Sequence, residues 1–177
     1  MRALGLDGSP TGAGKTARVI EAVLAGLPPD WQHDVIHVAG DQDAALARVE
    51  QADAFVFGAP MYRATYAAPL KGLLDRLPRG MWGETSAPIT GRAVAIVGTG
   101  ASWHHFLGLD PLRDVLAGFF AAHVLPPGLY VPGEGFDVDG RLRDSFAELA
   151  ALQGAALAEL ARVLSAGGAL AALRPQA

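Results

Sequence analysis

Residues 2–16 read Arg-Ala-Leu-Gly-Leu-Asp-Gly-Ser-Pro-Thr-Gly-Ala-Gly-Lys-Thr, and every other prediction starts from them. The apolar run 3–6 predicts a strand, residues 8–14 predict a loop, and the segment from Lys15 has the apolar spacing of a helix. Glycines let a backbone approach a ligand closely, and the first N–H groups and the dipole of a helix attract an anion. The stretch therefore predicts a phosphate-binding loop at the carboxyl end of the first strand.

The composition indicates one domain that needs no disulfide or structural metal. Hydrophobic residues make up 51% of the 177 residues, and a chain of this length can bury roughly 70% of its unfolded surface. The chain has no cysteine, so redox chemistry would require a bound cofactor. The net charge is −4, without a basic patch, a long apolar run or a visible secretory signal. We expect a cytoplasmic protein that binds neither nucleic acid nor membrane.

Short strands alternate with helices along the rest of the chain. The expected strands are 34–38, 53–58, 92–97 and 124–131; the expected helices are 44–49, 69–77, 105–122 and 143–165. This alternation predicts a doubly wound α/β sheet in a single domain over residues 1–168, followed by a frayed tail over 169–177. Ligands bind such sheets at the carboxyl ends of the strands, where the expected loops 8–16, 60–66 (part of a longer loop over 59–68) and 98–105 lie.

One alternative arises from Gly14-Lys15-Thr16, which matches the end of the nucleoside triphosphate motif Gly-x-x-x-x-Gly-Lys-Thr. The residue five positions before Gly14 is Ser9, so the leading glycine, Gly8, comes one position too early. No acidic residue follows the central buried strands to hold magnesium. A P-loop-like phosphotransferase is thus the less favoured alternative, and the hydroxyl-rich loop suits a phosphate monoester better.

Two further loops carry a resemblance to a known family. Residues 60–75, Pro-Met-Tyr-Arg-Ala-Thr-Tyr-Ala-Ala-Pro-Leu-Lys-Gly-Leu-Leu-Asp, resemble the Pro-x-Tyr loop and following helix of the NAD(P)H-dependent FMN reductases. The similarity is greatest to the branch that supplies reduced flavin to sulfonate-degrading monooxygenases. Residues 99–102, Thr-Gly-Ala-Ser, with His105 and Asp110 downstream, are similar to the third loop of that branch. The resemblance runs from residue 4 to about residue 131.

The chain also departs from this family's pattern. Thr11 and Gly14 stand where the family commonly carries Arg and Ser, Ala101 replaces a glycine, and Trp103 and His104 replace small or aliphatic residues. We expect FMN binding to survive these changes, whereas the choice of substrate can differ.

The resemblance implies a flavodoxin-like three-layer sandwich with a five-stranded parallel sheet in the order 2-1-3-4-5. It implies FMN as cofactor, NADPH or NADH as co-substrate, and electron transfer to free flavin, a quinone or a similar acceptor. A flavin-dependent monooxygenase is a candidate partner, and relatives assemble as homodimers or homotetramers through helices such as 69–77 and 105–122. The alternative is an FMN-binding electron carrier of flavodoxin type without fast NAD(P)H turnover.

The residues expected to bind FMN fall into three groups. The phosphate would rest on the loop amides and on Ser9, Thr11, Gly14, Lys15 and Thr16; the ring would lie against Pro60, Met61 and Tyr62; and Gly98, Thr99, Gly100, Ala101 and Ser102 would approach from the other side. We expect no acid–base catalytic residue and no metal ligand. Some alternatives stay open: Lys15 as a solvated residue, Tyr62 and Tyr66 as packing residues, Trp103 as a lid or a dimer contact, and Arg63 or Arg79 as the partner of a 2′-phosphate.

Overall fold

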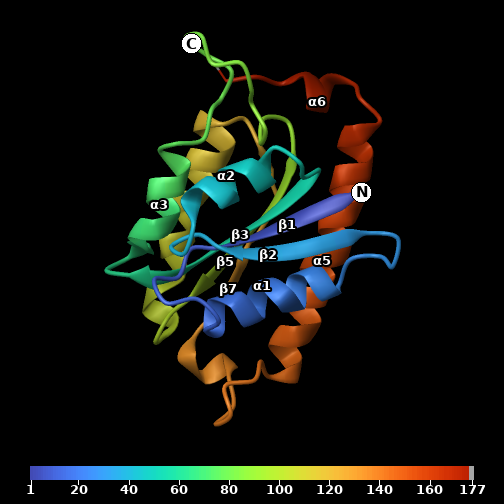
Figure 1. The fold of residues 1–177 in the computed structure, drawn as a ribbon. Helices are drawn as coiled ribbons and strands as arrows, with labels where there is room; N and C mark the ends of the chain where they lie inside the picture. The colour runs from blue at the N-terminus through green and yellow to red at the C-terminus, as the bar shows by residue number, and fades with distance from the viewer. Residues whose placement is uncertain (176–177) are drawn as a thin grey trace.

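A central parallel β-sheet organises the computed structural model, which describes residues 1–175 (Figure 1). Its strands are β1 (Arg2–Asp7), β2 (Gln32–His37), β3 (Ala54–Tyr62), β5 (Ala93–Thr99), β6 (His123–Val124) and β7 (Leu129–Val131), with the short strand β4 (Thr65–Tyr66) paired to β3. The order is β2-β1-β3-β5-β6, and β7 also pairs with β5. The expected order 2-1-3-4-5 agrees with the order of the parallel strands, but the sheet of the described chain has seven strands rather than the expected five, since β4 is added and β7 also pairs with β5.

The fifth position of the sheet is shared by two short strands. Strand β6 pairs with β5 at Ala93, and β7 pairs with β5 from Val97 onward. Pro126 and Pro127 lie between them and have no N–H to donate to the ladder. This explains why the expected single strand over 124–131 is interrupted.

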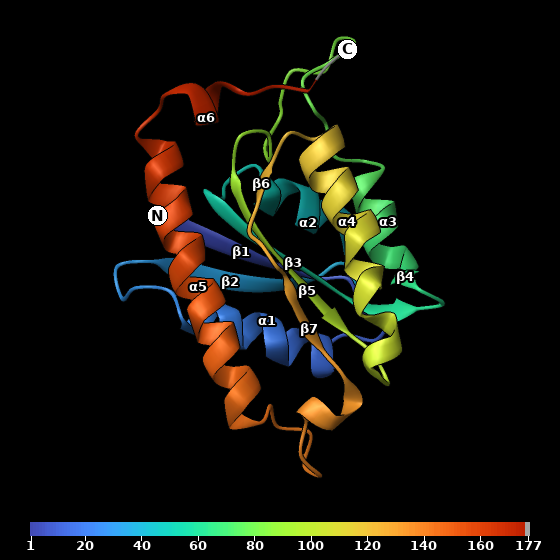
Figure 2. The same ribbon diagram turned by 180° about the vertical axis from the view of Figure 1, so that it is seen from behind.

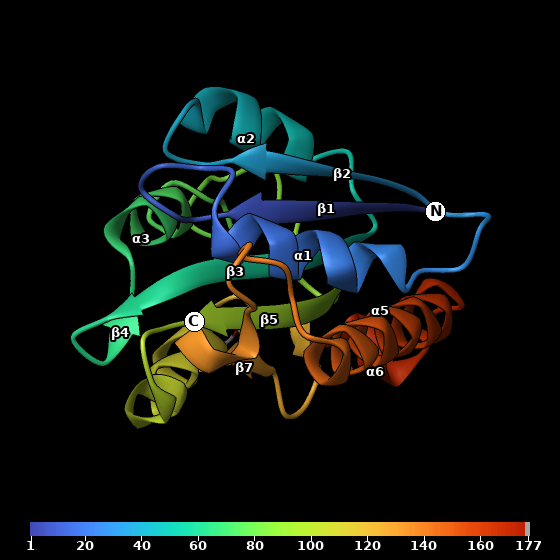
Figure 3. The same ribbon diagram turned by 90° about the horizontal axis from the view of Figure 1, so that it is seen from below.

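Helices cover both faces of the sheet, so the fold has three layers (Figures 2 and 3). Helices α1 (Lys15–Ala25) and α5 (Asp144–Ser165) pack on one face; α2 (Gln42–Val49), α3 (Ala68–Leu74) and α4 (Asp110–Asp114) pack on the other. Successive strand residues point to opposite faces. In β3, Phe55 and Phe57 belong to the core beneath α2, α3 and α4, whereas Ala54 and Val56 belong to the core beneath α1 and α5.

Two glycines let α1 and α5 approach each other closely. A Cβ atom at Gly154 would overlap the carbonyl oxygen of Val23, and one at Gly26 would overlap the backbone of Ala151. Since no other residue type lacks a Cβ atom, the contact between these helices depends on glycine at both positions.

The segment 59–68 is not the loop expected from the sequence. Strand β3 continues through Pro60 and Met61 to Tyr62, and β4 returns antiparallel, with Met61 opposite Tyr66. Arg63 and Ala64 form the turn at positive φ angles of 51° and 67°. Positive φ at both central residues matches the twist of a two-residue hairpin. Figure 3 shows the hairpin projecting beyond the sheet.

The prediction of a single helix over 105–122 is also wrong. The chain instead forms the 3₁₀ segment η1 (Trp103–Leu109), the short helix α4 and the π-helical segment η2 (Val115–Phe119). Pro111 occupies the first turn of α4, where its missing N–H costs nothing, but it cannot continue a helix from η1.

The end of the chain contains two further elements. Phe136 and Leu142 form an antiparallel bridge, and residues 169–172 form the short helix α6 (Ala169–Ala172). The last residues of the expected frayed tail, 176–177, lie outside the described residues. Among residues 1–175, no helix combines the length and apolar character needed to cross a membrane.

Candidate functional site

A cavity of about 790 Å³ opens at the carboxyl ends of β1, β3 and β5. This is where the strand order reverses, and the volume lies within the range of small-molecule sites. Its lining comes from three segments that are far apart in the sequence, and from one residue of a fourth: Ser9, Pro10, Thr11, Gly14, Lys15 and Thr16; Pro60, Met61, Tyr62 and Arg63; Thr99, Gly100, Ala101 and His105; and Gly133.

The structure brings together nearly all the residues expected around a ligand. Gly98 and Ser102 do not line the cavity. Gly98 is buried within β5, and the Ser102 hydroxyl lies 3.2 Å from His104 Nδ1. The lining also includes Gly133, which sequence reasoning missed because it follows the last strand and carries no local signal. Its N–H donates to the carbonyl oxygen of Ala101 (3.3 Å).

Helix α1 presents unsatisfied donors to the cavity. Gly14 is its N-cap residue, and no side chain caps it. The first N–H groups of a helix have no partner within the helix and carry its positive dipole end. Since Gly14, Lys15 and Thr16 line the cavity, these donors fit an anion there.

The Ser9 hydroxyl, expected to contact the phosphate, is bonded to protein groups in this structure. It donates to Asp7 Oδ2 (2.9 Å) and accepts the N–H of Gly12 (3.2 Å). The Ser9 N–H also bonds to Asp7, through Oδ1 (3.0 Å). Gly12 has a φ of +65°, which suits glycine. Ser9 therefore holds the loop in shape rather than pointing its hydrogen into the cavity.

A second hydroxyl pair joins the first and third segments. Thr16 Oγ1 and Thr99 Oγ1 are 2.8 Å apart, and both residues are buried. One hydroxyl must donate to the other, so one of the two hydrogens stays available to a ligand. The pair fixes the start of α1 to the end of β5.

The end of β3 gives the cavity a largely apolar wall. Pro60, Met61 and Tyr62 are the last residues of β3; Met61 is buried, whereas Tyr62 is 57% exposed. On the opposite wall a Cβ atom at Gly100 would overlap the hydroxyl of Tyr130, which donates to the carbonyl oxygen of Ser102 (2.6 Å). Because glycine has no Cβ atom, position 100 leaves the room that the Tyr130 hydroxyl needs to reach the Ser102 carbonyl oxygen.

Tyr66 and Trp103, whose roles the sequence left open, both contact other parts of the protein. Tyr66 is buried in the core beneath α3, so it is a packing residue. The Trp103 ring lies 6.0 Å from the Tyr130 ring at a tilt of 48°, and its Nε1 donates to Glu134 (2.6 Å); Trp103 does not line the cavity. Burial raises the pKa of Tyr66 and the pKa of Tyr130, so both phenols are neutral at physiological pH.

The ionisable side chains that line the cavity are one lysine, one arginine and one histidine. Lys15 lies over the Phe136 ring, 4.9 Å from its centroid, and Arg63 and His105 stand at other points of the lining. No carboxylate lines the cavity within the described chain, and residues 1–175 contain no group of three side chains suited to a metal ion. A phosphate at the start of α1, joined to a flat apolar group against Pro60 to Tyr62, fits this arrangement.

Comparisons with known proteins point to the same kind of ligand. A family model described as NADPH-dependent FMN reductase matches residues 1–137. The NADH-dependent FMN reductase SfnF of Pseudomonas putida is 36% identical over 99 residues, which are 56% of this chain and 50% of that protein. The FMN reductase (NADPH) of Escherichia coli is 28% identical over 141 residues, 71% of this chain and 70% of that protein.

Solved structures agree on the fold. The apo form of an NADH:FMN oxidoreductase, EmoB, matches 92% of this chain and 89% of its own, with a TM-score of 0.71 and 26% identity. A WrbA-like flavodoxin from Agrobacterium tumefaciens matches with a TM-score of 0.69 at 23% identity, covering 92% of this chain and 98% of its own. The match to SfnF spans about half of that relative's length.

Proposed function

The chain belongs to the family of NADPH-dependent FMN reductases, and we propose that it is an oxidoreductase that binds FMN in the cavity and reduces it with a nicotinamide. One observation carries the proposal: the uncapped start of α1 and the apolar end of β3 line the same cavity. The first suits a phosphate monoester and the second suits a flat ring.

Each group of lining residues has a role in this proposal. The N–H groups at the start of α1, Lys15 and the Thr11 hydroxyl hold the phosphate, and the Thr16–Thr99 pair offers a further donor. Pro60, Met61 and Tyr62 support the ring and exclude water from one of its faces. When bound, FMN supplies the hydride-accepting chemistry that this chain's side chains lack. The protein contributes binding and orientation.

We further propose that free flavin or a quinone accepts the electrons, with a flavin-dependent monooxygenase as a candidate partner. The name of the P. putida relative supports a flavin acceptor, since that protein is described as an FMN reductase. The open cavity allows a second flat molecule to reach the exposed Tyr62.

The central experiment is spectroscopic. We expect the purified protein to bind FMN, and the flavin absorbance at about 450 nm to bleach when NADPH or NADH is added without oxygen. A protein that binds no flavin would contradict the proposal. Bound flavin that stays oxidised with both nicotinamides would favour the electron-carrier alternative.

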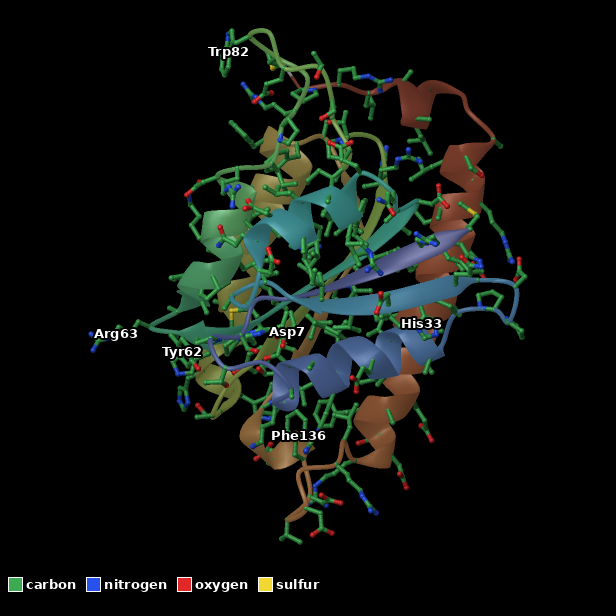
Figure 4. The ribbon with its side chains drawn as sticks, in the orientation of Figure 1. Asp7, His33, Tyr62, Arg63, Trp82 and Phe136 are labelled. Atoms are coloured by element: carbon green, nitrogen blue, oxygen red, sulfur yellow. The ribbon has the colours of Figure 1, made fainter. Side chains whose placement is uncertain are left out.

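Arg63 is expected to favour NADPH over NADH. Arg63 lines the cavity, and Figure 4 shows it beside Tyr62 at the tip of the hairpin. Within residues 1–175 its guanidinium group has no hydrogen-bond or ion-pair partner. Arg79, the other candidate, stacks on Phe119 (3.9 Å) and Trp82 (4.7 Å), away from the cavity lining. A free guanidinium binds a phosphate with charge-assisted hydrogen bonds.

The test compares two matched variants, Arg63→Gln and Arg79→Gln. We expect Arg63→Gln to lower the ratio of kcat/KM for NADPH to that for NADH by about five- to tenfold, mainly through KM for NADPH. Binding of 2′,5′-ADP, measured by calorimetry, should weaken in parallel. Arg79→Gln should leave the ratio unchanged; the opposite pattern would assign the 2′-phosphate to Arg79.

A further inference from the structure

Asp7 is a buried carboxylate directly beneath the phosphate-binding loop. It is the last residue of β1, it is 1% exposed, and no other charged side chain is buried in the part of the chain that the structure describes (Figure 4). Burying a charge is costly unless hydrogen bonds compensate for it. Both side-chain oxygens of Asp7 are bonded, and both bonds come from Ser9.

These bonds fix the direction of the Ser9 hydroxyl. A carboxylate only accepts hydrogen bonds, so the contact of 2.9 Å between Ser9 Oγ and Asp7 Oδ2 must use the hydroxyl hydrogen of Ser9. The oxygen of the same hydroxyl accepts the Gly12 N–H at 3.2 Å. The hydrogen therefore points into the protein, although Ser9 lines the cavity.

We propose that Asp7 lowers the affinity of the cavity for the phosphate of FMN. It does so by taking a donor that the phosphate would otherwise receive, and by placing a like charge beneath the anion. Asp7 acts through Ser9 and is a positioning residue. The inference rests on the proposed function only in taking FMN as the ligand.

Asp7→Asn reverses the direction of one hydrogen bond while keeping the shape of the side chain. The amide oxygen can still accept the Ser9 N–H, and this places the amide nitrogen, a donor, opposite Ser9 Oγ. Ser9 Oγ then receives hydrogens from the asparagine and from Gly12, so its own hydrogen is released toward the cavity. The variant gains a donor and loses a negative charge.

The experiment measures dissociation constants of the apoprotein for FMN and for riboflavin, which lacks the phosphate, by quenching of flavin fluorescence. We expect Asp7→Asn to bind FMN about tenfold more tightly, the size of one charge-assisted hydrogen bond, and to bind riboflavin as the wild type does. Adding Ser9→Ala to this variant should remove the gain. A gain that survives Ser9→Ala, or that is equal for riboflavin, would overturn the inference.

Ser9→Ala in the wild-type background provides a second, independent measurement. Because the hydroxyl does not reach the phosphate, FMN affinity should fall by less than about threefold. The carbonyl oxygen of Ser9 stays bonded to His37 Nε2 (2.7 Å), which continues to hold the loop. A loss of about tenfold or more that is absent for riboflavin would overturn the inference, even if Asp7→Asn does not fold.

The outcomes separate the two proposals. A wild-type chain that binds no FMN would overturn the proposed function, and this inference with it. If the wild-type chain binds FMN and a nicotinamide reduces that FMN, but Asp7→Asn shows no gain in FMN affinity, this inference alone is overturned.

Discussion

Gly154→Val should lower the free energy of unfolding by about 3–5 kcal/mol, the largest effect on stability that we expect from one substitution. A side chain at this position meets the carbonyl oxygen of Val23 and the backbone of Gly26, neither of which can rotate away. Helices α1 and α5 would have to separate, and this would open the core beneath them. Chemical denaturation followed by circular dichroism measures the change.

Gly118→Ala is the matched control for this prediction. A Cβ atom at Gly118 meets nothing within 4 Å, so the free energy of unfolding should change by no more than about 1 kcal/mol. Equal losses in the two variants would show that glycine flexibility, rather than the helix contact, explains the effect.

The largest expected effect on ligand binding comes from Gly100→Ala, which should weaken FMN binding by about thirtyfold or more. The added methyl group would overlap the hydroxyl of Tyr130. Tyr130 would have to leave the Ser102 carbonyl oxygen, or residues 99–102 would move into the cavity. FMN titration of the apoprotein measures the loss.

Two variants make this prediction specific. Gly100→Ala combined with Tyr130→Phe removes the overlapping oxygen, leaves the nearest ring carbon 3.2 Å from the methyl group, and should restore most of the affinity. Gly118→Ala should bind FMN as the wild type does, because Gly118 does not line the cavity and its added methyl group meets nothing within 4 Å. If the double variant does not recover FMN affinity, the overlap with the Tyr130 hydroxyl is not the cause of the loss in Gly100→Ala.

The sequence predicted the alternation of buried strands and helices because continuous apolar runs are strong signals, whereas the sheet order followed from the resemblance to the family. The apolar runs of β3 and β5 are continuous, and the loops after β1 and β5 carry glycines and hydroxyl residues. The family model, which covers residues 1–137, agrees with the resemblance of the loops. The strands and the loops after them are predictable because they depend on local patterns of residues.

The remaining differences depend on hydrogen bonds that no local pattern specifies. Pro60 is typical of a loop, yet β3 continues through it, beyond Gly58 where its pairing with β1 ends. The apolar spacing over 105–122 suits 3₁₀, α and π turns alike, so the mixture of segments was not predictable. The direction of the Ser9 hydroxyl depends on Asp7, which the sequence presents only as the last residue of a strand.

The homodimer or homotetramer stays a prediction. Trp103, Phe106 and Leu107 are apolar side chains at least half exposed, which suits a contact between copies of the chain, and sedimentation of the purified protein would decide. The cytoplasmic location and the roles of the lining residues also stay predictions.

The hairpin of β3 and β4 has a consequence for the cost of binding. Pro60 is opposite Thr99 of β5, Met61 is opposite Tyr66 and Tyr62 is opposite Thr65, so the ring-supporting wall belongs to the sheet. The conformational entropy of this wall is lost when the chain folds, not when a ligand arrives. Entropy lost on binding should therefore come mainly from the ligand and from the exposed side chains of Tyr62 and Arg63.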